Sequence, residues 1–367
     1  MNREALPWEN IFPAAPENGP VVRLRLRLLR RHGQPLLLVP ERGDAARTAL
    51  NLYPAQTRKA RLARGVLRAL AGFGVLPGAE TCELRLAADA PFVRFLCPPG
   101  SGRETISLAV LLGNPNVAGR RFLMLVFDGA GHPVRVIKLG TDAAAARLVR
   151  REAEFLRNLT PGRLHAPELL GEFSEAARAA LALAYAPGPT PAADDFRSLS
   201  ALLTAWLDTN RTVRFGELAA ARQLAESGVA DAASRLAQSR LAEVTFHPAI
   251  HHGDFAPWNI RVGPAGQWRV LDWERGEAVG PPAWDWFHYW LQPRVLVWRQ
   301  APVAILREFE ELRRHPAFAE YAQLAGIGQL LDALWLGYLV HCRDVTRQAE
   351  GMPAIRELVE RVAATAR

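Results

Sequence analysis

Hydrophobic and polar residues alternate strictly over residues 21–28 (VVRLRLRL), near the start of the chain. This period of two predicts a strand with one buried and one exposed face. The turn-like RHGQ and the apolar PLLLVP of residues 35–40 follow directly, so the pattern predicts a hairpin. Residues 55–72 then carry apolar positions at helical spacing among basic residues, which predicts a basic amphipathic helix that ends near Gly72 or Gly74.

Residues 82–96 predict two more short strands, and residues 97–104 (CPPGSGRE) predict a loop and a boundary. After this loop the pattern changes to three apolar strand candidates in quick succession, which are residues 106–113, 120–128 and 134–140. A helix is expected to begin after Asp142, a good N-cap residue, and to end near Leu159. Two further strands are predicted near residues 167–173 and 179–185.

Residues 184–195 (AYAPGPTPAADD) contain three prolines and predict a linker. The chain beyond it is expected to be mostly helical, apart from short strands around residues 248–274. The predicted fold class is therefore α+β, with a small antiparallel sheet carrying one helix, a larger and mostly helical lobe, and an extra α+β segment at the N-terminus. The expected boundaries are 1–100, 101–186 and 187–367.

The composition, 49% hydrophobic and 22% charged over 367 residues, excludes an intrinsically disordered chain and a fibrous repeat. No apolar run is long enough for a membrane span, and the N-terminus lacks the pattern of a signal peptide. The three cysteines, Cys82, Cys97 and Cys342, are too few and too scattered for a disulfide framework or a zinc cage. The expected compartment is the reducing cytosol, with peripheral attachment to the inner membrane as an open alternative.

Basic residues are distributed unevenly along the chain. Of the net charge of +8, residues 1–100 account for +7, because they hold 15 Lys and Arg against 8 Asp and Glu. This asymmetry indicates an N-terminal segment with a role of its own. Only two of the 45 basic residues are lysines, Lys59 and Lys138. A lysine that persists in such an arginine-rich chain points to a need for a compact point charge.

The segment HHGDFAPWNIRV, followed by QWRVLDWERG, carries the most specific pattern in the sequence. His252 lies two residues before Asp254, Asn259 follows five residues after Asp254, and Asp272 follows the apolar strand WRVL. This is the H-x-D-x-x-x-x-N spacing of a kinase catalytic loop, with a downstream aspartate at the matching distance.

The residue types fit phosphoryl transfer. A carboxylate such as that of Asp254 can orient an acceptor hydroxyl and accept its proton late in the reaction. The amide of Asn259 and the carboxylate of Asp272 offer the oxygen ligands that Mg²⁺ prefers. We expect His252 to brace the loop by hydrogen bonding.

The motifs HHGDFAPWNI, VLDWERG and GPPAWDW resemble the signature of the aminoglycoside phosphotransferase and choline kinase-like family, over roughly residues 105–367. The resemblance implies a two-lobed protein-kinase-like fold, ATP and Mg²⁺ as cofactors, Asp254 as the catalytic base, and Asn259 and Asp272 as Mg²⁺ ligands. Protein kinases have glycine at the position that Glu274 occupies here. This replacement is usual in the small-molecule branch, so it favours a small-molecule acceptor over a protein.

A kinase also needs a strand lysine that contacts the nucleotide phosphates and is held by a helix glutamate. Lys138 ends the apolar strand VRVIK. Glu152 shares one helix face with Leu148 and Phe155, whereas Glu154 points to the opposite side. A carboxylate on an apolar face needs a cationic partner, so Glu152 is predicted to pair with Lys138 and Glu154 to be solvated.

Four further site predictions rest on position. The nucleotide loop is expected between the first two kinase strands, with Gly113 and Gly119. The backbone of Ala184, Tyr185 and Ala186 is expected to hydrogen-bond adenine. Asp285 is expected to accept hydrogen bonds from the catalytic-loop backbone. The residues expected near the acceptor pocket are Trp258, Trp273 and Glu274.

Two other functions stay open at this point. A catalytically inactive kinase-like module that binds nucleotide or a partner is favoured by the irregular glycine loop and opposed by the complete set of catalytic residues. A zinc hydrolase built on His247, His251 and His252 is opposed by their spacing and leaves Lys138 unexplained.

The identity of the acceptor is less constrained. A sugar, a glycan or another metabolite is favoured over an aminoglycoside, because the helical lobe is nearly neutral and residues after 272 are rich in aromatics and arginine. The basic N-terminal segment could present a solvated face, or it could bind an anionic surface or a phosphorylated glycan. Nucleic acid is not expected as a partner, because no aromatic residues interleave with the arginines.

Overall fold

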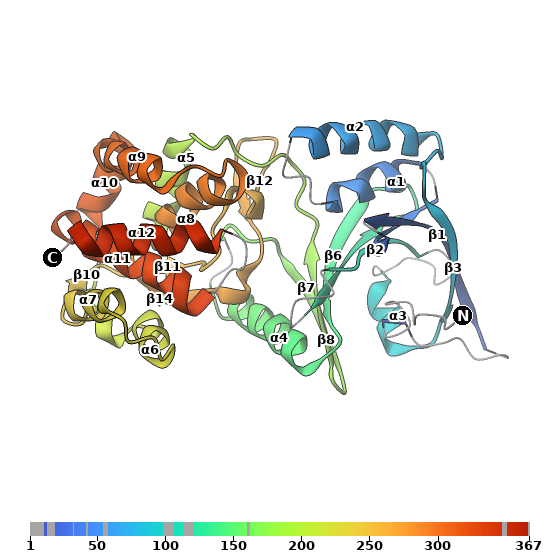
Figure 1. Cartoon of the computed structure of the whole chain (residues 1–367). Helices are drawn as coiled ribbons and strands as arrows, with labels where there is room; N and C mark the ends of the chain where they lie inside the picture. Colours follow the sequence, from blue (N-terminus) through green and yellow to red (C-terminus); the bar gives the residue numbers. More distant parts are fainter. Residues whose placement is uncertain are drawn as a thin grey trace. The chain divides into compact units, whose positions relative to one another are not determined.

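The computed structural model describes residues 11–12, 19–31, 33–41, 43–53, 58–97, 106–113, 120–159, 162–346 and 351–365. The chain divides into two compact units (Figure 1). The sheet unit comprises Met1–Glu154 and Pro167–Tyr185, and the helical unit comprises Phe155–Ala166 and Ala186–Arg367. This division into a sheet-rich and a helix-rich unit confirms the predicted α+β class, while the three-part boundaries drawn from the sequence stay a prediction.

The sheet unit is built on one eight-stranded sheet in the order β3-β1-β2-β4-β5-β6-β8-β7, in which every neighbouring pair is antiparallel. The strands are β1 Val21–Arg31, β2 Gln34–Pro40, β3 Glu80–Ala87, β4 Ser107–Leu111, β5 Arg121–Phe127, β6 Pro133–Gly140, β7 Leu169–Glu175 and β8 Arg178–Ala184. The first three come from the basic N-terminal segment. They join the other five where Leu37 and Leu38 of β2 pair with Leu111 and Val110 of β4.

Helices cover both faces of this sheet. They are α1 Gly43–Ala49, the short 3-10 helix η1 Leu50–Leu52, α2 Arg58–Gly72, α3 Pro91–Leu96 and α4 Ala143–Asn158. One buried cluster joins Leu24, Leu26 and Leu38 to the side chains of α3. The other cluster joins Leu37 and Leu125 to α1 and to the inner side of α2. The alternation of strand residues therefore fills two cores, one on each face.

Most of the elements predicted for this unit are confirmed, including the first hairpin, the basic helix, the three central strands, the last two strands and α4. Asp142 caps α4, since its Oδ1 accepts a 2.8 Å hydrogen bond from the N–H of Ala145. The loop predicted over residues 97–104 lies outside the described residues except for Cys97.

The second of the two strands predicted within residues 82–96 is wrong, because Pro91–Leu96 forms the helix α3. Proline at the first helical position has the required φ and lacks an N–H that would be unpaired there. The turn of helix buries Phe92, Val93 and Leu96 on one side. A short apolar run fits a strand and a buried helix equally well, so its pattern alone could not decide.

The helical unit confirms the prediction of a mostly helical region with short strands around residues 248–274. Its helices are α5 Phe196–Ala205, α6 Ala219–Glu226, α7 Ala232–Leu241, α8 Trp284–Gln292, α9 Pro302–Arg314, α10 Pro316–Leu324, α11 Leu331–His341 and α12 Met352–Thr365. Its short strands are β9 Val213–Arg214, β10 Thr245–Phe246, β11 Ala249–His251, β12 Ile260–Val262, β13 Trp268–Val270 and β14 Glu277–Gly280. Short 3-10 turns lie at η2 Phe215–Glu217, η3 Pro257–Asn259, η4 Trp273–Arg275 and η6 Gly328–Leu330, and π-helical turns at η5 Pro293–Val297 and η7 Cys342–Thr346.

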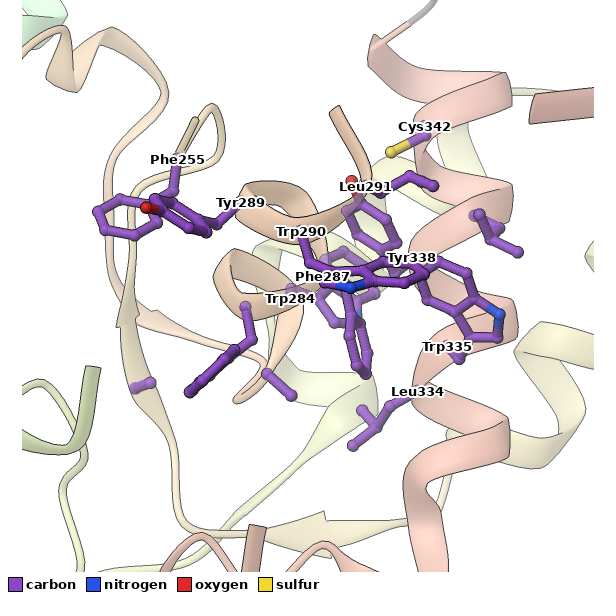
Figure 2. Packing of buried hydrophobic residues seen from close by; sticks show 14 of the residues in the cluster. Phe255, Trp284, Phe287, Tyr289, Trp290, Leu291, Leu334, Trp335, Tyr338 and Cys342 are labelled. Carbon is purple, nitrogen blue, oxygen red and sulfur yellow. The ribbon is translucent and has the colours of Figure 1, made fainter. Parts of the chain in front are cut away.

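Aromatic side chains dominate the core of the helical unit. Figure 2 shows Trp284, Phe287 and Trp290 of α8 lying against Trp335 and Tyr338 of α11. All nine residues of α8 are buried, so this helix is enclosed by its neighbours. The abundance of tryptophan in this part of the sequence is therefore mainly a property of the core. Within the part of the chain that the structure describes, no helix is long and apolar enough to cross a membrane.

Candidate active site

The loop His252-Gly253-Asp254 follows β11 and precedes the turn η3. Gly253 has a φ of +79°, and a Cβ placed on it would lie 2.9 Å from Cβ and 3.0 Å from the carbonyl oxygen of Arg275. Other residues rarely adopt this conformation, and here they would also collide with the neighbouring backbone. The glycine therefore sets the course of the loop into Asp254.

Asp285, at the start of α8, accepts hydrogen bonds from the backbone of this loop. Its Oδ2 accepts a 2.7 Å hydrogen bond from the N–H of His252, and its Oδ1 accepts a 3.2 Å hydrogen bond from the N–H of Gly253. The carboxylate is only 5% exposed. Two backbone donors thus satisfy a buried charge, in the arrangement that the sequence analysis suggested for this residue.

His252 links the loop to the strand end that precedes Asp272. Its Nε2 lies 2.8 Å from the carbonyl oxygen of Leu271, and the N–H of Asp254 donates to its Nδ1 at 3.2 Å. These contacts require a proton on Nε2 and a lone pair on Nδ1, which is a neutral ring. Burial lowers the pKa of His252 and favours the same neutral form.

The two carboxylate oxygens of Asp254 have different partners. Oδ1 lies 3.0 Å from Nε2 of His288, and Oδ2 accepts a 3.1 Å hydrogen bond from Nδ2 of Asn259. Burial works to raise the pKa of Asp254, but the hydrogen bond and the positive charge of His288 outweigh it, so the pKa is lowered. The side chain is ionised at neutral pH and still one-quarter exposed.

His288 is a residue that the sequence analysis missed. It comes from α8, three residues after Asp285, so both side chains lie on one side of the helix. Burial works to lower the pKa of His288, but its hydrogen bond to Asp254 and contacts with Cys342 raise it to about 9. Nδ1 lies 3.1 Å from the hydroxyl oxygen of Tyr338, which gives the ring a second fixed partner. The spacing D-x-x-H within the apolar segment WDWFHYW was the only signal available in the sequence.

Asn259 and Asp272 lie at the two ends of the β12–β13 hairpin, and the N–H of Leu271 donates to the carbonyl oxygen of Asn259 at 2.7 Å. Nδ2 of Asn259 also donates to the carbonyl oxygen of Asp254 at 2.8 Å. This bond and the bond from Nδ2 to Oδ2 of Asp254 orient the amide and direct its Oδ1 away from Asp254. Asp272 has a φ of +71°, which is uncommon for a residue with a side chain and occurs at functional sites.

The donor set of Asn259 and Asp272 fits Mg²⁺. Both residues supply hard oxygen ligands, and Mg²⁺ is commonly held by one or two protein groups together with substrate phosphates and water. Histidine and cysteine ligands, which would favour zinc, do not gather here. His247 contacts the carbonyl oxygen of Arg211, His252 contacts that of Leu271, and His251 lies 3.6 Å from Asp285.

In the sheet unit, Lys138 and Glu152 form a close ion pair. Nζ of Lys138 lies 2.7 Å from each carboxylate oxygen of Glu152. The side chains are 12% and 1% exposed, while Glu154 is exposed to solvent. The structure therefore makes the pairing that the helix-face argument predicted, between β6 and α4.

The residues expected to bind nucleotide are described only in part. Gly113 has a φ of +66°, and a Cβ on it would lie 2.6 Å from the carbonyl oxygen of Arg121. Gly119 lies outside the described residues. The N–H groups of Ala184 and Tyr185 donate to the carbonyl oxygens of Glu168 and Val134, and Ala186 begins the helical unit.

The three residues suggested for the acceptor pocket differ in burial. Trp273 is 1% exposed, stacks on Phe155 and contacts Trp206, and it donates from Nε1 to the carbonyl oxygen of Val270. The ring of Trp273 therefore lies in the core and offers no surface to an acceptor. Glu274 is also buried, whereas Trp258 is half-buried.

Comparisons with known proteins bear on the family of this chain. A search of curated proteins found no match. Among solved structures, the chain resembles a thermostable mutant of aminoglycoside phosphotransferase APH(4)-Ia in ternary complex with ADP and hygromycin B, with 19% identity over 71% of this chain and 95% of that one and a TM-score of 0.46.

It also resembles the choline kinase LicA from Streptococcus pneumoniae, with 15% identity over 70% of this chain and 94% of that one and a TM-score of 0.43. A sequence model of the phosphotransferase enzyme family matches residues 118–327, which include Lys138, Glu152 and the whole catalytic loop. The model covers more than half of the chain, so the chain belongs to the phosphotransferase enzyme family.

Proposed function

We propose that this protein transfers the γ-phosphoryl group of ATP, with Mg²⁺, to a hydroxyl group of a small molecule. The observation that carries the proposal is the setting of Asp254. Its carboxylate is ionised and fixed on one oxygen by His288 and on the other by Asn259, yet part of it stays exposed. A fixed carboxylate of this kind can receive a hydroxyl group and align it for attack.

The lowered pKa of Asp254 defines how this carboxylate would act. A weak base cannot remove a hydroxyl proton before bond formation begins. It can accept a hydrogen bond from the hydroxyl, keep the oxygen in line, and take the proton as the oxygen loses electron density late in the transfer. The hydrogen bond from His288 keeps the carboxylate ready in its ionised form.

Asn259 and Asp272 would hold the Mg²⁺ through their side-chain oxygens. When bound, the ion neutralises charge on the phosphate oxygens of the nucleotide. Asn259 also contacts Asp254 through Nδ2, so a single side chain connects the metal ligand set to the base. The loop bonds of His252 and Asp285 keep these groups in register.

Lys138 would contact the nucleotide phosphates, with Glu152 restricting its side chain to one position. The pair is buried enough for the interaction to be strong and for its geometry to be maintained. Gly113 and Gly119 are the glycines of the proposed phosphate loop. Because the N–H groups of Ala184 and Tyr185 are engaged in the sheet, these two residues would offer adenine their carbonyl oxygens.

A sugar, a glycan or another metabolite is the proposed acceptor, in preference to an aminoglycoside. The support is the near-neutral charge of the helical region, since a polycationic drug calls for an acidic pocket. The aromatic residues no longer contribute to this argument, because most of them are buried. We place the reaction in the reducing cytoplasm, consistent with the three free cysteines.

The test is a screen of hydroxyl-bearing metabolites for ADP release, with identification of the phosphorylated product by mass spectrometry. Acceptor-dependent ADP release that disappears in Asp254→Asn is the expected result. Tight nucleotide binding without turnover across sugars, amino alcohols and aminoglycosides would favour the alternative, a catalytically inactive nucleotide-binding module. Turnover with aminoglycosides alone would contradict the proposed acceptor class.

A further inference from the structure

The helix α2 presents a row of apolar side chains to solvent. Leu62 is 73% exposed, Val66 is 54% exposed and Phe73, directly after the helix, is 87% exposed. These positions are four and seven residues apart, so they lie along one side of the helix. Of the eight large apolar side chains that are exposed in the described residues, four fall within residues 62–75.

The position of α2 in the sheet unit explains why this row is outermost. The short helix α1 packs on β2 and β4, and α2 packs on α1, so α2 forms an outer layer (Figure 1). Its inner side contributes Leu67 and Ala71 to the core beneath it. The helix thus has two apolar sides, and only the inner one is used in packing. We call Leu62, Val66 and Phe73 the α2 row.

The stretch of sequence that carries the α2 row is strongly basic. The helix carries Arg58, Lys59, Arg61, Arg64 and Arg68, and no Asp or Glu occurs between residues 45 and 79. An apolar row among cations fits a partner that is both anionic and apolar.

The first strand adds positive charge on the same side of the sheet. Leu29 pairs with Leu37, which belongs to the core beneath α1 and α2. By alternation along β1, Arg23 and Arg25 also point to this side, and both are exposed. Their neighbours across the strand pair are Arg85 and Glu83, so this part of the surface is positive overall.

We propose that α2 docks the protein onto an anionic lipid bilayer. Leu62, Val66 and Phe73 enter the boundary between headgroups and acyl chains, and Lys59 and the arginines of β1 contact the lipid phosphates. A bilayer supplies the anionic layer and the apolar layer at the depths that such a surface requires. The proposal is independent of the chemistry at Asp254.

Two other occupants fit less well. A second copy of this chain would bring two strongly basic surfaces together, and their repulsion opposes association. A nucleic acid would satisfy the basic side chains but would leave Leu62 and Val66 against water, since phosphates and sugars offer them no apolar layer.

The experiment uses the full chain and vesicles of phosphatidylcholine, alone or with phosphatidylglycerol. Sedimentation at low salt is expected to show binding to the phosphatidylglycerol vesicles at least about tenfold tighter than to phosphatidylcholine alone, and weaker binding at high salt. The absence of binding to anionic vesicles at low salt overturns the proposal.

The double variant Leu62→Ser/Phe73→Ser tests the α2 row. It is expected to weaken binding to anionic vesicles by about tenfold or more, because two exposed apolar anchors are removed. The matched control is Val303→Ser/Leu324→Ser, which changes two apolar residues of the helical unit that are 58% and 45% exposed. The control is expected to bind as the wild type does.

Both outcomes of the variant test are decisive. Since Leu62 and Phe73 make little contact in the fold, circular dichroism and thermal unfolding should match the wild type. Unchanged vesicle binding by the folded double variant would reduce the site to a purely electrostatic surface and overturn the proposal. Loss of a concentration-dependent dimer in the double variant, without vesicle binding by the wild type, would assign the α2 row to a second copy.

Discussion

Nε2 of His288 lies 3.0 Å from Oδ1 of Asp254, and this contact joins the middle of the buried helix α8 to the catalytic loop. The imidazole is 3% exposed and is fixed on its other side by Tyr338. A buried cation beside the proposed base both orients the carboxylate and keeps it ionised. The consequences can be measured.

His288→Gln keeps a hydrogen-bond donor near Asp254 but removes the charge. We expect kcat to fall about tenfold or more, with little change in the KM for ATP, because His288 touches the base and not the nucleotide. His288→Phe, which removes the donor too, should lower kcat further. The measurement is steady-state kinetics with the acceptor found by screening.

The control for His288 is His341→Gln. His341 is also a buried histidine, 8% exposed, but its Nε2 contacts Gln223 and not the catalytic loop. It should lower stability and leave kcat unchanged. Equal losses of kcat in both variants would mean that His288 acts only through the stability of the core.

The same pair predicts how stability depends on pH. The pKa of His288 is raised from 6.5 to about 9 in the fold, so its stabilising effect is complete below about 6.5 and is lost as the pH rises through 9. This rise corresponds to at most about 3 kcal/mol. Asp254 has a lowered pKa, so its contribution is present above its ordinary value of 3.8 and is lost at lower pH.

Urea unfolding at pH 7 and pH 10 checks this prediction. The wild type should lose more free energy of unfolding between these two conditions than His288→Gln does, because only the wild type releases a proton from this site. The difference between the two proteins removes the contribution of other groups that titrate over the range. A wild type and variant with parallel pH dependence would show that His288 is not protonated in the fold at neutral pH.

Asp254→Asn should lower kcat by roughly 10²–10⁴-fold while ATP binding stays nearly unchanged. The amide keeps the shape of the side chain but cannot accept the hydroxyl proton. Isothermal titration calorimetry with ATP and Mg²⁺ measures the affinity for ATP, and product formation measures kcat. Wild-type turnover in this variant would remove Asp254 from the role of base.

Lys138→Ala should weaken productive use of ATP strongly, and Lys138→Arg should restore it only in part. The guanidinium is larger than an ammonium group, and the Glu152 carboxylate already lies 2.7 Å from the lysine Nζ. The matched control is Lys59→Arg, which changes the chain's other lysine, an exposed residue of α2. Full activity in Lys138→Arg would show that any cation suffices.

Asp285→Ala removes the acceptor of two backbone hydrogen bonds in the catalytic loop. We expect a loss of about 3 kcal/mol in unfolding free energy, because the N–H groups of His252 and Gly253 lose a buried charged partner. The control is Asp332→Ala, since Asp332 is 65% exposed and its ion pair with Arg313 lies at the surface. A loss in Asp285→Ala no larger than in the control would show that water replaces the carboxylate.

The fold and the catalytic loop could be predicted where the information is local. The alternation in VVRLRLRL sets the faces of β1, and the short spacing from His252 to Asn259 defines the loop. The choice of Glu152 over Glu154 as the partner of Lys138 followed from the helix face. Each of these inferences depends on residues of a single element or of two consecutive elements in the sequence.

The remaining features depend on tertiary packing. His288 lies 34 residues from Asp254 in sequence and within a segment that is apolar nearly all round, so no periodic pattern marked it. Trp273 flanks a proposed metal ligand, yet its ring fills the core. The segment Pro91–Leu96 forms a helix because this conformation buries Phe92, Val93 and Leu96. A short apolar run in the sequence does not reveal that packing.

Because β2 pairs with β4, the N-terminal strands also cover what would otherwise be an edge of the kinase sheet. β4 has β2 on one side and β5 on the other, so every kinase strand from β4 onward but the outermost, β7, has two neighbours. In a shortened chain that begins at β4, this apolar strand would be a sheet edge with unpaired backbone groups. Leu108 and Val110 would also lose the apolar side chains of the N-terminal segment that pack against them. Such an edge can recruit a strand from another molecule. We therefore expect the basic N-terminal segment to protect the kinase sheet from aggregation.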